Sequence, residues 1–143
     1  MPERKRLAHA WIIAGFSLLA LSAVVSVVAA VRHGFVGRSD VRFDVQLFLD
    51  PLGALAAVWA WRALGQVAVE ESRHARLFRT AFLALGAEMA TFALTDGLYL
   101  SSSPRLTQYS ASTWVGGTGS LAAALGFWMM SREFAPSAPA TGE

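Results

Sequence analysis

The sequence contains no cysteine, which excludes disulfide bonds, thiol chemistry and cysteine-ligated metal sites. Charged residues are scarce: they make up 15% of the chain, against about 25% in soluble domains. Lysine occurs only at position 5, so arginine supplies nearly all of the positive charge. The chain also lacks a glycine-rich phosphate loop, a nucleophile elbow and an HExxH motif. These absences argue against a soluble domain and against the common classes of hydrolase.

Hydrophobic residues, in contrast, make up 55% of the chain. They gather in four blocks, at residues 7–31, 46–69, 77–100 and 112–130. Each block is long enough, or nearly so, to cross a hydrocarbon core about 30 Å thick at about 1.5 Å per residue. The pattern predicts an all-α integral membrane protein, in which residues 1–133 form a single bundle of four transmembrane helices. The composition of residues 134–143 predicts a disordered tail.

The first block follows a basic N-terminus and therefore resembles a signal peptide. However, the uninterrupted apolar or small-residue stretch from Trp11 to Val31 is longer than the usual signal core of about 7–15 residues. We expect it to be retained as a membrane helix.

Basic residues flank the blocks unequally, and the larger group falls on the side of both termini. That group is Arg4, Lys5, Arg6, Arg62, Arg73, Arg76, Arg79 and Arg132. The smaller group is Arg32, Arg38, Arg42 and Arg105. Cytoplasmic loops carry the excess of Lys and Arg, so we expect both termini in the cytoplasm and the bundle in a bacterial inner membrane.

Small residues recur along one face of the first block and again along the fourth. Such faces let helix backbones approach closely in lipid. They support either packing within the bundle or oligomerisation. The residues are Gly15, Ser22, Ser26, Gly116, Gly119, Ser120 and Gly126.

The start of the second helix is open to two interpretations. Asp50 is a typical N-cap and Pro51 is tolerated in the first helical turn, so the regular helix begins near Pro51. Alternatively, it begins near Val45 and Pro51 kinks it. The alternation of apolar and polar residues from Val41 to Val45 is typical of a short strand or an interfacial stretch.

Glu88 lies in the middle of the third block, where a carboxylate costs about 2.5 kcal/mol or more on insertion scales. Helical spacing places three further polar residues on its face: Thr91, Thr95 and Tyr99. Lipid cannot satisfy these groups, so they should face the bundle or a cavity. Three explanations stay open: hydroxyls bonded back to their own helix, a neutral Glu88 that acts in packing, or a polar path.

Other charged residues offer partners or further sites. Arg62 is either an ion-pair partner of Glu88 from the neighbouring helix or a side chain that extends to the cytoplasmic headgroups. Asp50 and Asp96 lie at similar depth near the outer side, where two carboxylates could bind a cation or share a proton, although a cap and a helix end explain them as well. The three histidines do not form a ligand set, so no metal or cofactor is expected.

The expected function is that of an accessory or interaction subunit of a membrane complex, acting through helix–helix contacts rather than as an enzyme. Its expected partners are the lipid bilayer and either another membrane protein or a second copy of the chain, not nucleic acid. The alternative is a small oligomeric proton- or cation-coupled transporter or channel that uses Glu88.

Overall fold

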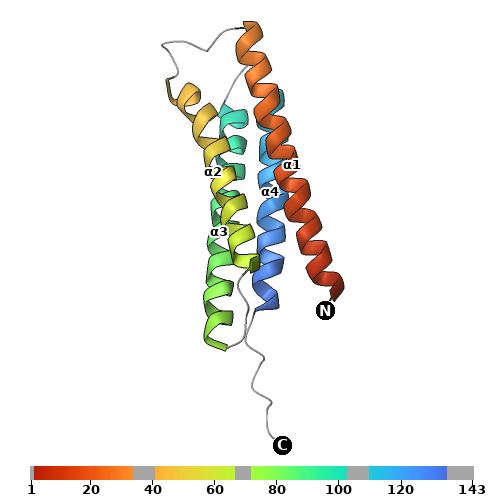
Figure 1. Ribbon diagram of the computed structural model, residues 1–143. Coiled ribbons are helices and arrows are strands. Elements are labelled where there is room, and N and C mark those ends of the chain that lie inside the picture. Colours follow the sequence, from red (N-terminus) through yellow and green to blue (C-terminus); the bar gives the residue numbers. More distant parts are fainter. Residues whose placement is uncertain (1, 34–40, 67–71, 103–109, 135–143) are drawn as a thin grey trace, which may run out of the picture.

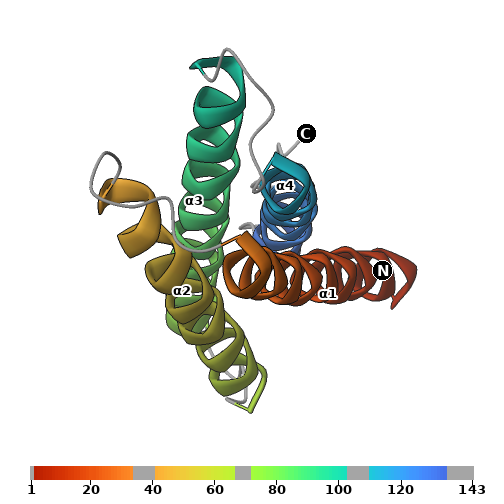
Figure 2. The ribbon, with the colours of Figure 1, turned by 90° about the horizontal axis from the view of Figure 1, so that it is seen from above.

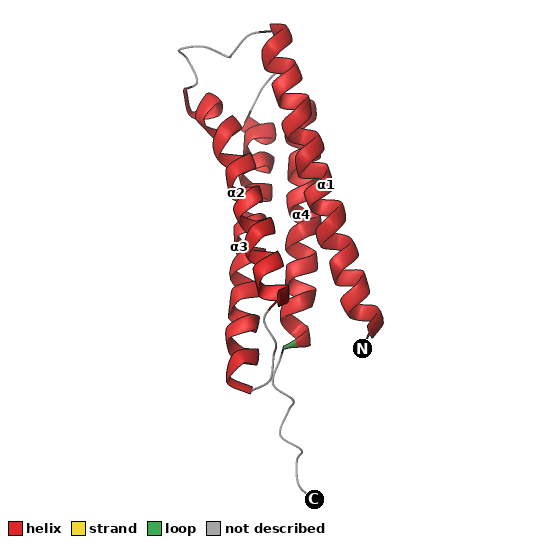
Figure 3. Cartoon of the chain, in the orientation of Figure 1, coloured by secondary structure: helices red, strands yellow, loops and turns green. Residues whose placement is uncertain are grey.

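The computed structural model describes residues 2–33, 41–66, 72–102 and 110–134. These residues form four helices and contain no strand: α1 (Pro2–His33), α2 (Val41–Gln66), α3 (Ser72–Ser102) and α4 (Ser110–Glu133). Figure 3 shows this all-helical composition. The prediction of an all-α chain with four helices is therefore confirmed over the part of the chain that the structure describes.

The four helices run alternately up and down along one long axis (Figure 1). The start of α1 and the end of α4 lie at one end of the bundle, which we call the terminal end. The start of α2 and the start of α4 lie at the other, which we call the distal end. Viewed along the axis, α4 lies against both α1 and α3, and α2 stands on the open side between α1 and α3 (Figure 2).

Helix α4 is the centre of the bundle. It makes extensive contacts with α1 and α3, whereas α2 makes few contacts with either of its neighbours. Twelve of the 24 residues of α4 are buried, many of them Gly, Ala or Ser. Glycine costs about 1 kcal/mol in a helix relative to alanine. Close packing against two neighbouring helices offsets that cost, because it brings backbones within van der Waals contact.

The contact between α1 and α4 is made through backbone. A Cβ atom built on Gly15 would lie 2.6 Å from the Ala123 nitrogen, and one on Gly119 would lie 2.8 Å from the Gly15 carbonyl oxygen. A Cβ on Gly126 would lie 2.8 Å from the Ala8 carbonyl oxygen. A real Cβ does not fit at these distances, so these three positions of the α1–α4 contact require glycine.

The terminal half of the bundle has an aromatic core. Phe127 of α4 is fully buried, as are Ile12 of α1 and Met89 of α3. The Phe127 ring lies 6.3 Å from Phe82 and 6.0 Å from Phe16, measured between ring centroids. Offset and edge-on ring pairs at such distances add to the gain from burial. Phe78 and Phe134 continue the cluster towards the terminal end.

Helix α2 contributes more than one side chain to this core. Ala57 is buried in it, and Trp61 packs against it. The Trp61 ring lies 6.5 Å from Phe16 and 5.7 Å from His9. Trp59, two residues earlier, is 76% exposed. The two tryptophans therefore face opposite ways, and Trp61 is the one that meets α1.

The beginning of α2 corrects one prediction and decides between two interpretations. The segment from Val41 to Val45, expected as a strand-like or interfacial stretch, forms the first turns of the helix. The helix contains Pro51, as in the interpretation with a start near Val45, and does not begin near Pro51 with Asp50 as its cap. Intrahelical hydrogen bonds on both sides of the proline can hold a helix of this length despite the missing donor. The strand-like alternation was too short to decide between the two periods.

Two of the helices are long and apolar enough to cross a membrane by themselves: the span Glu3–Ala29 in α1 and the span His74–Ser102 in α3. Within the residues described, α2 and α4 do not meet the same criterion. Many of the residues of α4 are Ser, Thr or Gly, which lowers its hydropathy. The two spans therefore do not by themselves establish that all four helices cross a membrane, or which membrane it is.

Candidate functional site

The residues of the polar stripe on α3 lie in different surroundings. The Thr91 hydroxyl donates to the Ala87 carbonyl oxygen at 2.9 Å, and the Thr95 hydroxyl donates to the Thr91 carbonyl oxygen at 2.9 Å. Both bonds lie within α3, which is the arrangement in which threonine hydroxyls satisfy themselves. Thr91 is exposed and Tyr99 lines a cavity at the distal end. The stripe is thus divided between separate environments.

Glu88 lies where α3 passes α2. Its side chain is half-buried, and its Oε1 atom is 3.6 Å from a Cβ built on Gly53. The Phe92 ring, one turn further along α3, also closes on Gly53, with its Cζ atom 2.7 Å from that Cβ position. The absence of a side chain at Gly53 therefore lets two side chains of α3 reach the backbone of α2.

The structure does not bring Arg62 to Glu88. Arg62 is exposed, whereas the Glu88 carboxyl group lies against Gly53 of α2. Gly53 is nine residues, or about 14 Å along the helix, from Arg62. Glu88 therefore meets the backbone of α2 at Gly53 and not the Arg62 side chain.

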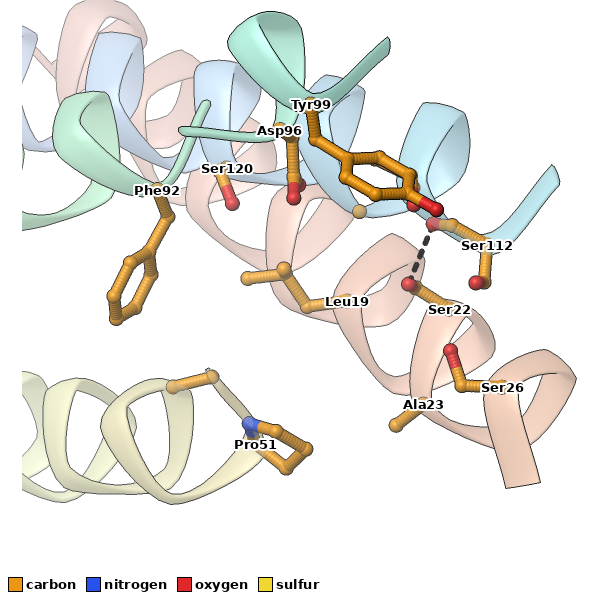
Figure 4. A pocket seen from close by; sticks show the side chains of 13 residues that line it. Leu19, Ser22, Ala23, Ser26, Pro51, Phe92, Asp96, Tyr99, Ser112 and Ser120 are labelled. Atoms are coloured by element: carbon orange, nitrogen blue, oxygen red, sulfur yellow. Dashed lines mark hydrogen bonds between the residues drawn. The ribbon is translucent and has the colours of Figure 1, made fainter. Parts of the chain in front are cut away.

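All four helices converge on a cavity in the distal half of the bundle, with a volume of about 70 Å³. Helix α2 supplies Pro51 and Ala54, and α3 supplies Phe92, Asp96 and Tyr99. The other lining residues belong to the facing sides of α1 and α4: Leu19, Ser22, Ala23, Ser26, Ser112, Thr113, Gly116 and Ser120. Figure 4 shows the labelled side chains around this space. Among the residues that the structure describes, the lining holds one carboxyl group, several hydroxyl groups and no basic side chain.

Asp96 approaches α4 at a pair of glycines. A Cβ built on Gly116 would lie 3.3 Å from Asp96 Oδ2 and 2.9 Å from Ser22 Oγ. A Cβ built on Gly117 would lie 3.2 Å from Asp96 Cβ. The two glycines thus make the room in which the Asp96 carboxyl and the Ser22 hydroxyl come together. Ser22 in turn donates to the Ser112 carbonyl oxygen at 2.7 Å.

Ser120 is the exception among the hydroxyls of α4. Thr118 donates to the Trp114 carbonyl oxygen and Ser131 donates to the Trp128 carbonyl oxygen. The Ser120 hydroxyl is fully buried and has no hydrogen-bond partner in the described structure. Figure 4 shows it directed into the cavity beside Asp96. An unsatisfied buried hydroxyl costs about 1–3 kcal/mol. A molecule or ion bound in the cavity that interacts with the Ser120 oxygen would offset this cost.

The predicted carboxylate pair is described only in part. Asp96 lies in the cavity wall. The backbone of Asp50 belongs to α2, directly before Pro51, but its side chain lies outside the described residues. No group of three or more His, Asp or Glu residues within the described ranges could hold a metal ion.

The small residues singled out in the sequence all lie on α1 and α4. Gly15, Gly119 and Gly126 hold the backbone contact. Ser22, Ser26, Gly116 and Ser120 line the cavity that follows it along the axis. The same faces therefore provide close packing in one half and a polar space in the other. The sequence indicates the spacing, but not that Ser112, Thr113, Pro51 and Phe92 close this space.

A second concave feature lies on the outside of the bundle, between α3 and α4. It is an apolar groove of about 390 Å³. Its floor consists of Gly86, Ala87, Ala90 and Ala124, and its rim of Leu83, Leu121, Leu125 and Trp128. On each helix the lining residues follow the spacing of a single face. The Arg132 guanidinium lies 4.0 Å over the Trp128 ring, which fixes the rim at the terminal end.

No protein-family model, curated protein or solved structure matches this chain.

Proposed function

We propose that this chain is an integral membrane protein of the bacterial inner membrane that crosses it four times and acts through helix–helix contacts, as an accessory or interaction subunit of a membrane complex. The observation that carries the proposal is the groove between α3 and α4. Gly86 and Ala90, one turn apart on its floor, form the small-xxx-small spacing that lets a further helix approach closely in lipid.

The composition of the groove differs from that of the other exposed faces. On α1 the exposed positions are large and branched, such as Ile13, Val24 and Val31, and on α2 they include Leu52 and Leu55. Such side chains meet lipid tails well. A floor of Gly and Ala leaves a gap that flexible lipid chains fill poorly and that a ridge of side chains from another helix fills well.

The occupant that fits is a transmembrane helix of a different membrane protein. In a symmetric dimer the small-residue floor would face the same floor of the second copy, whereas a helix with larger side chains at the contact would fill the groove more completely. The groove is also continuous along about two turns of α3 and of α4, which matches the contact length of a single helix that crosses them.

Site-specific crosslinking tests this proposal, because the chain has no cysteine of its own. Cysteine is introduced at Ala90 in the groove and, as the matched control, at Val24 on α1, and each is labelled with a photoactivatable group in native membranes. We expect Ala90→Cys to give one discrete crosslinked species with a membrane protein, identified by mass spectrometry, and Val24→Cys to give none.

A blocking variant makes the result specific. Ala87 is exposed on the groove floor, so Ala87→Trp fills the groove without entering the core, and it should abolish the crosslink from Ala90→Cys. Leu94→Trp, on the same helix outside the groove, should leave it intact. Crosslinks to lipid alone, or a crosslinked dimer of this chain, contradict the proposed partner.

One observation favours the alternative, a proton- or cation-coupled transporter that uses Glu88. This carboxyl group is half-buried at the contact between α3 and α2, and α2 is the helix with the fewest contacts in the bundle. A loosely held helix beside an intramembrane carboxyl group is suited to alternating access. Substitution of Glu88 by glutamine tests this transporter alternative.

A further inference from the structure

The distal cavity has the features of a binding site that is separate from the groove. Four helices contribute to it, and its polar groups come from three of them: Ser22 of α1, Asp96 and Tyr99 of α3, and Ser112 and Ser120 of α4. Asp96 lies about 9 Å along α3 from Ser102, and Ser120 about 15 Å along α4 from Ser110. Asp96 and Ser120 therefore lie inside the bundle, whereas Ser112 and Tyr99 lie closer to the ends of their helices.

The Ser120 hydroxyl points to an occupant. Hydroxyls inside membrane helices usually bond to a carbonyl of their own helix, as Thr118 and Ser131 do on α4. Ser120 instead directs its oxygen into the cavity without a hydrogen-bond partner. This rotamer leaves the lone pairs of the oxygen available to a ligand.

Charge and size limit what that ligand is. The described residues of the lining carry one carboxyl group and no basic side chain, which disfavours an anion. A volume of about 70 Å³ holds a few water molecules or one partly hydrated ion, but not a sugar, a nucleotide or a lipid headgroup. Ca²⁺ sites gather several carboxylates and carbonyls around one ion, and Mg²⁺ demands octahedral geometry, so a single carboxyl group among hydroxyls suits a monovalent ion better.

We propose that this cavity binds a monovalent metal cation of the size of Na⁺, with the Asp96 carboxylate and the Ser120 hydroxyl as ligands. Hard cations take oxygen ligands, and the lining of this cavity supplies a carboxylate and several hydroxyls. Gly116 and Gly117 keep the space open, because a Cβ at either position would approach the Asp96 side chain within 3.3 Å. The inference does not depend on a partner in the groove.

The test is thermal unfolding of the full chain in detergent micelles, in NaCl and in choline chloride at equal ionic strength. A ligand that binds only the folded state raises the midpoint temperature as its concentration rises. We expect NaCl, but not choline chloride, to raise the midpoint in a saturable manner. Asp96→Asn and Ser120→Ala should each weaken the apparent Na⁺ affinity about tenfold or more, as the loss of a supporting group does at other metal sites.

Two matched controls separate a binding site from a general salt effect. Glu133→Gln removes a carboxylate from α4 outside the cavity, and Ser131→Ala removes a buried hydroxyl that is bonded within α4; both should keep the full response to Na⁺. Direct binding of radioactive ²²Na⁺ to the purified chain decides the matter if Asp96→Asn does not fold, with Ser120→Ala as its comparison. Equal midpoints in NaCl and choline chloride together with no bound ²²Na⁺, or an undiminished Na⁺ response in Asp96→Asn or in Ser120→Ala, overturn the proposal and leave the cavity filled with water.

Discussion

The Ser22 hydroxyl donates a hydrogen bond of 2.7 Å to the backbone carbonyl oxygen of Ser112, and so ties α1 to the first turn of α4 across most of the length of the chain. Most other side-chain hydrogen bonds of the described residues join groups three or four positions apart in one helix, as those of Thr91 and Ser131 do. This bond lies at the distal end of the α1–α4 contact, where Ser22 and Ser112 line the cavity.

Ser22→Ala should lower the free energy of unfolding by about 0.6 kcal/mol, the average for interhelical hydrogen bonds in membranes, and by no more than about 1.7 kcal/mol. The measurement is thermal or denaturant unfolding in detergent. Ser101→Ala is the control, because the exposed Ser101 hydroxyl bonds only to the Leu98 carbonyl within α3 and its loss should be nearly neutral. Equal losses in both variants would show that the bond to Ser112 adds nothing between helices.

Gly126→Ala should destabilise the bundle although alanine is the better helix former. Its new methyl group would lie 2.8 Å from the Ala8 carbonyl oxygen and 2.9 Å from the Ile12 nitrogen, and backbone atoms cannot swing aside. We expect a loss of about 1–3 kcal/mol, the range for overpacking, and a larger one for Gly119→Leu. Both should appear as lower midpoints of unfolding in detergent.

Gly97→Ala is the matched control for these variants. Gly97 also lies within a helix, but no atom lies within 4 Å of a Cβ built there. The substitution should be neutral or stabilising by up to about 1 kcal/mol, from helix propensity alone. If Gly126→Ala behaves like Gly97→Ala, α1 and α4 do not pack through their backbones.

The orientation of the bundle gives the third prediction. A reporter fused after Glu143 should read as cytoplasmic, and one inserted next to Ser102 should read as external. The reason is the excess of basic residues on the side of the termini. An external reading after Glu143 contradicts the orientation. Cytoplasmic readings at both positions contradict the crossing of the membrane by α4.

Much of the fold follows from the composition of the chain. Apolar blocks separated by charged or turn-forming segments predict the four helices, and the spacing of Gly15, Gly119 and Gly126 marks the helix faces that meet. These features depend on local sequence and on the period of a helix. The central place of α4 is less evident, because small residues at a given spacing do not say which helices, or how many, lie against them.

The candidate site was less predictable, because it depends on rotamers and on register. The sequence does not show that Thr91 bonds to its own helix whereas the Ser120 hydroxyl faces a cavity. The pairing of Arg62 with Glu88 assumed helix ends near Val69 and Leu77. The structure instead places Glu88 against Gly53, which lies nine residues, or about 14 Å, along α2 from Arg62.

This register leads to the last prediction, which concerns Glu88. Because the Glu88 carboxyl group lies beside Gly53 rather than Arg62, Glu88→Gln should change the free energy of unfolding by less than about 0.5 kcal/mol, the usual range for a substitution that keeps shape and hydrogen-bonding capacity. Arg62→Gln, at an exposed position, should be equally mild. A double-mutant cycle by thermal unfolding in detergent measures the coupling between them.

We expect a coupling free energy near zero, since two side chains without shared partners act additively. A coupling above about 1 kcal/mol would instead establish a buried ion pair, whose single variants leave one charge uncompensated. The same Glu88→Gln protein is then placed in liposomes beside the wild type, and proton flux is followed with a pH-sensitive dye. Equal flux in both supports an interaction subunit. Flux that occurs in the wild type and is lost in a stably folded Glu88→Gln variant shows the carboxyl group at work in transport, because glutamine keeps its shape but cannot release a proton.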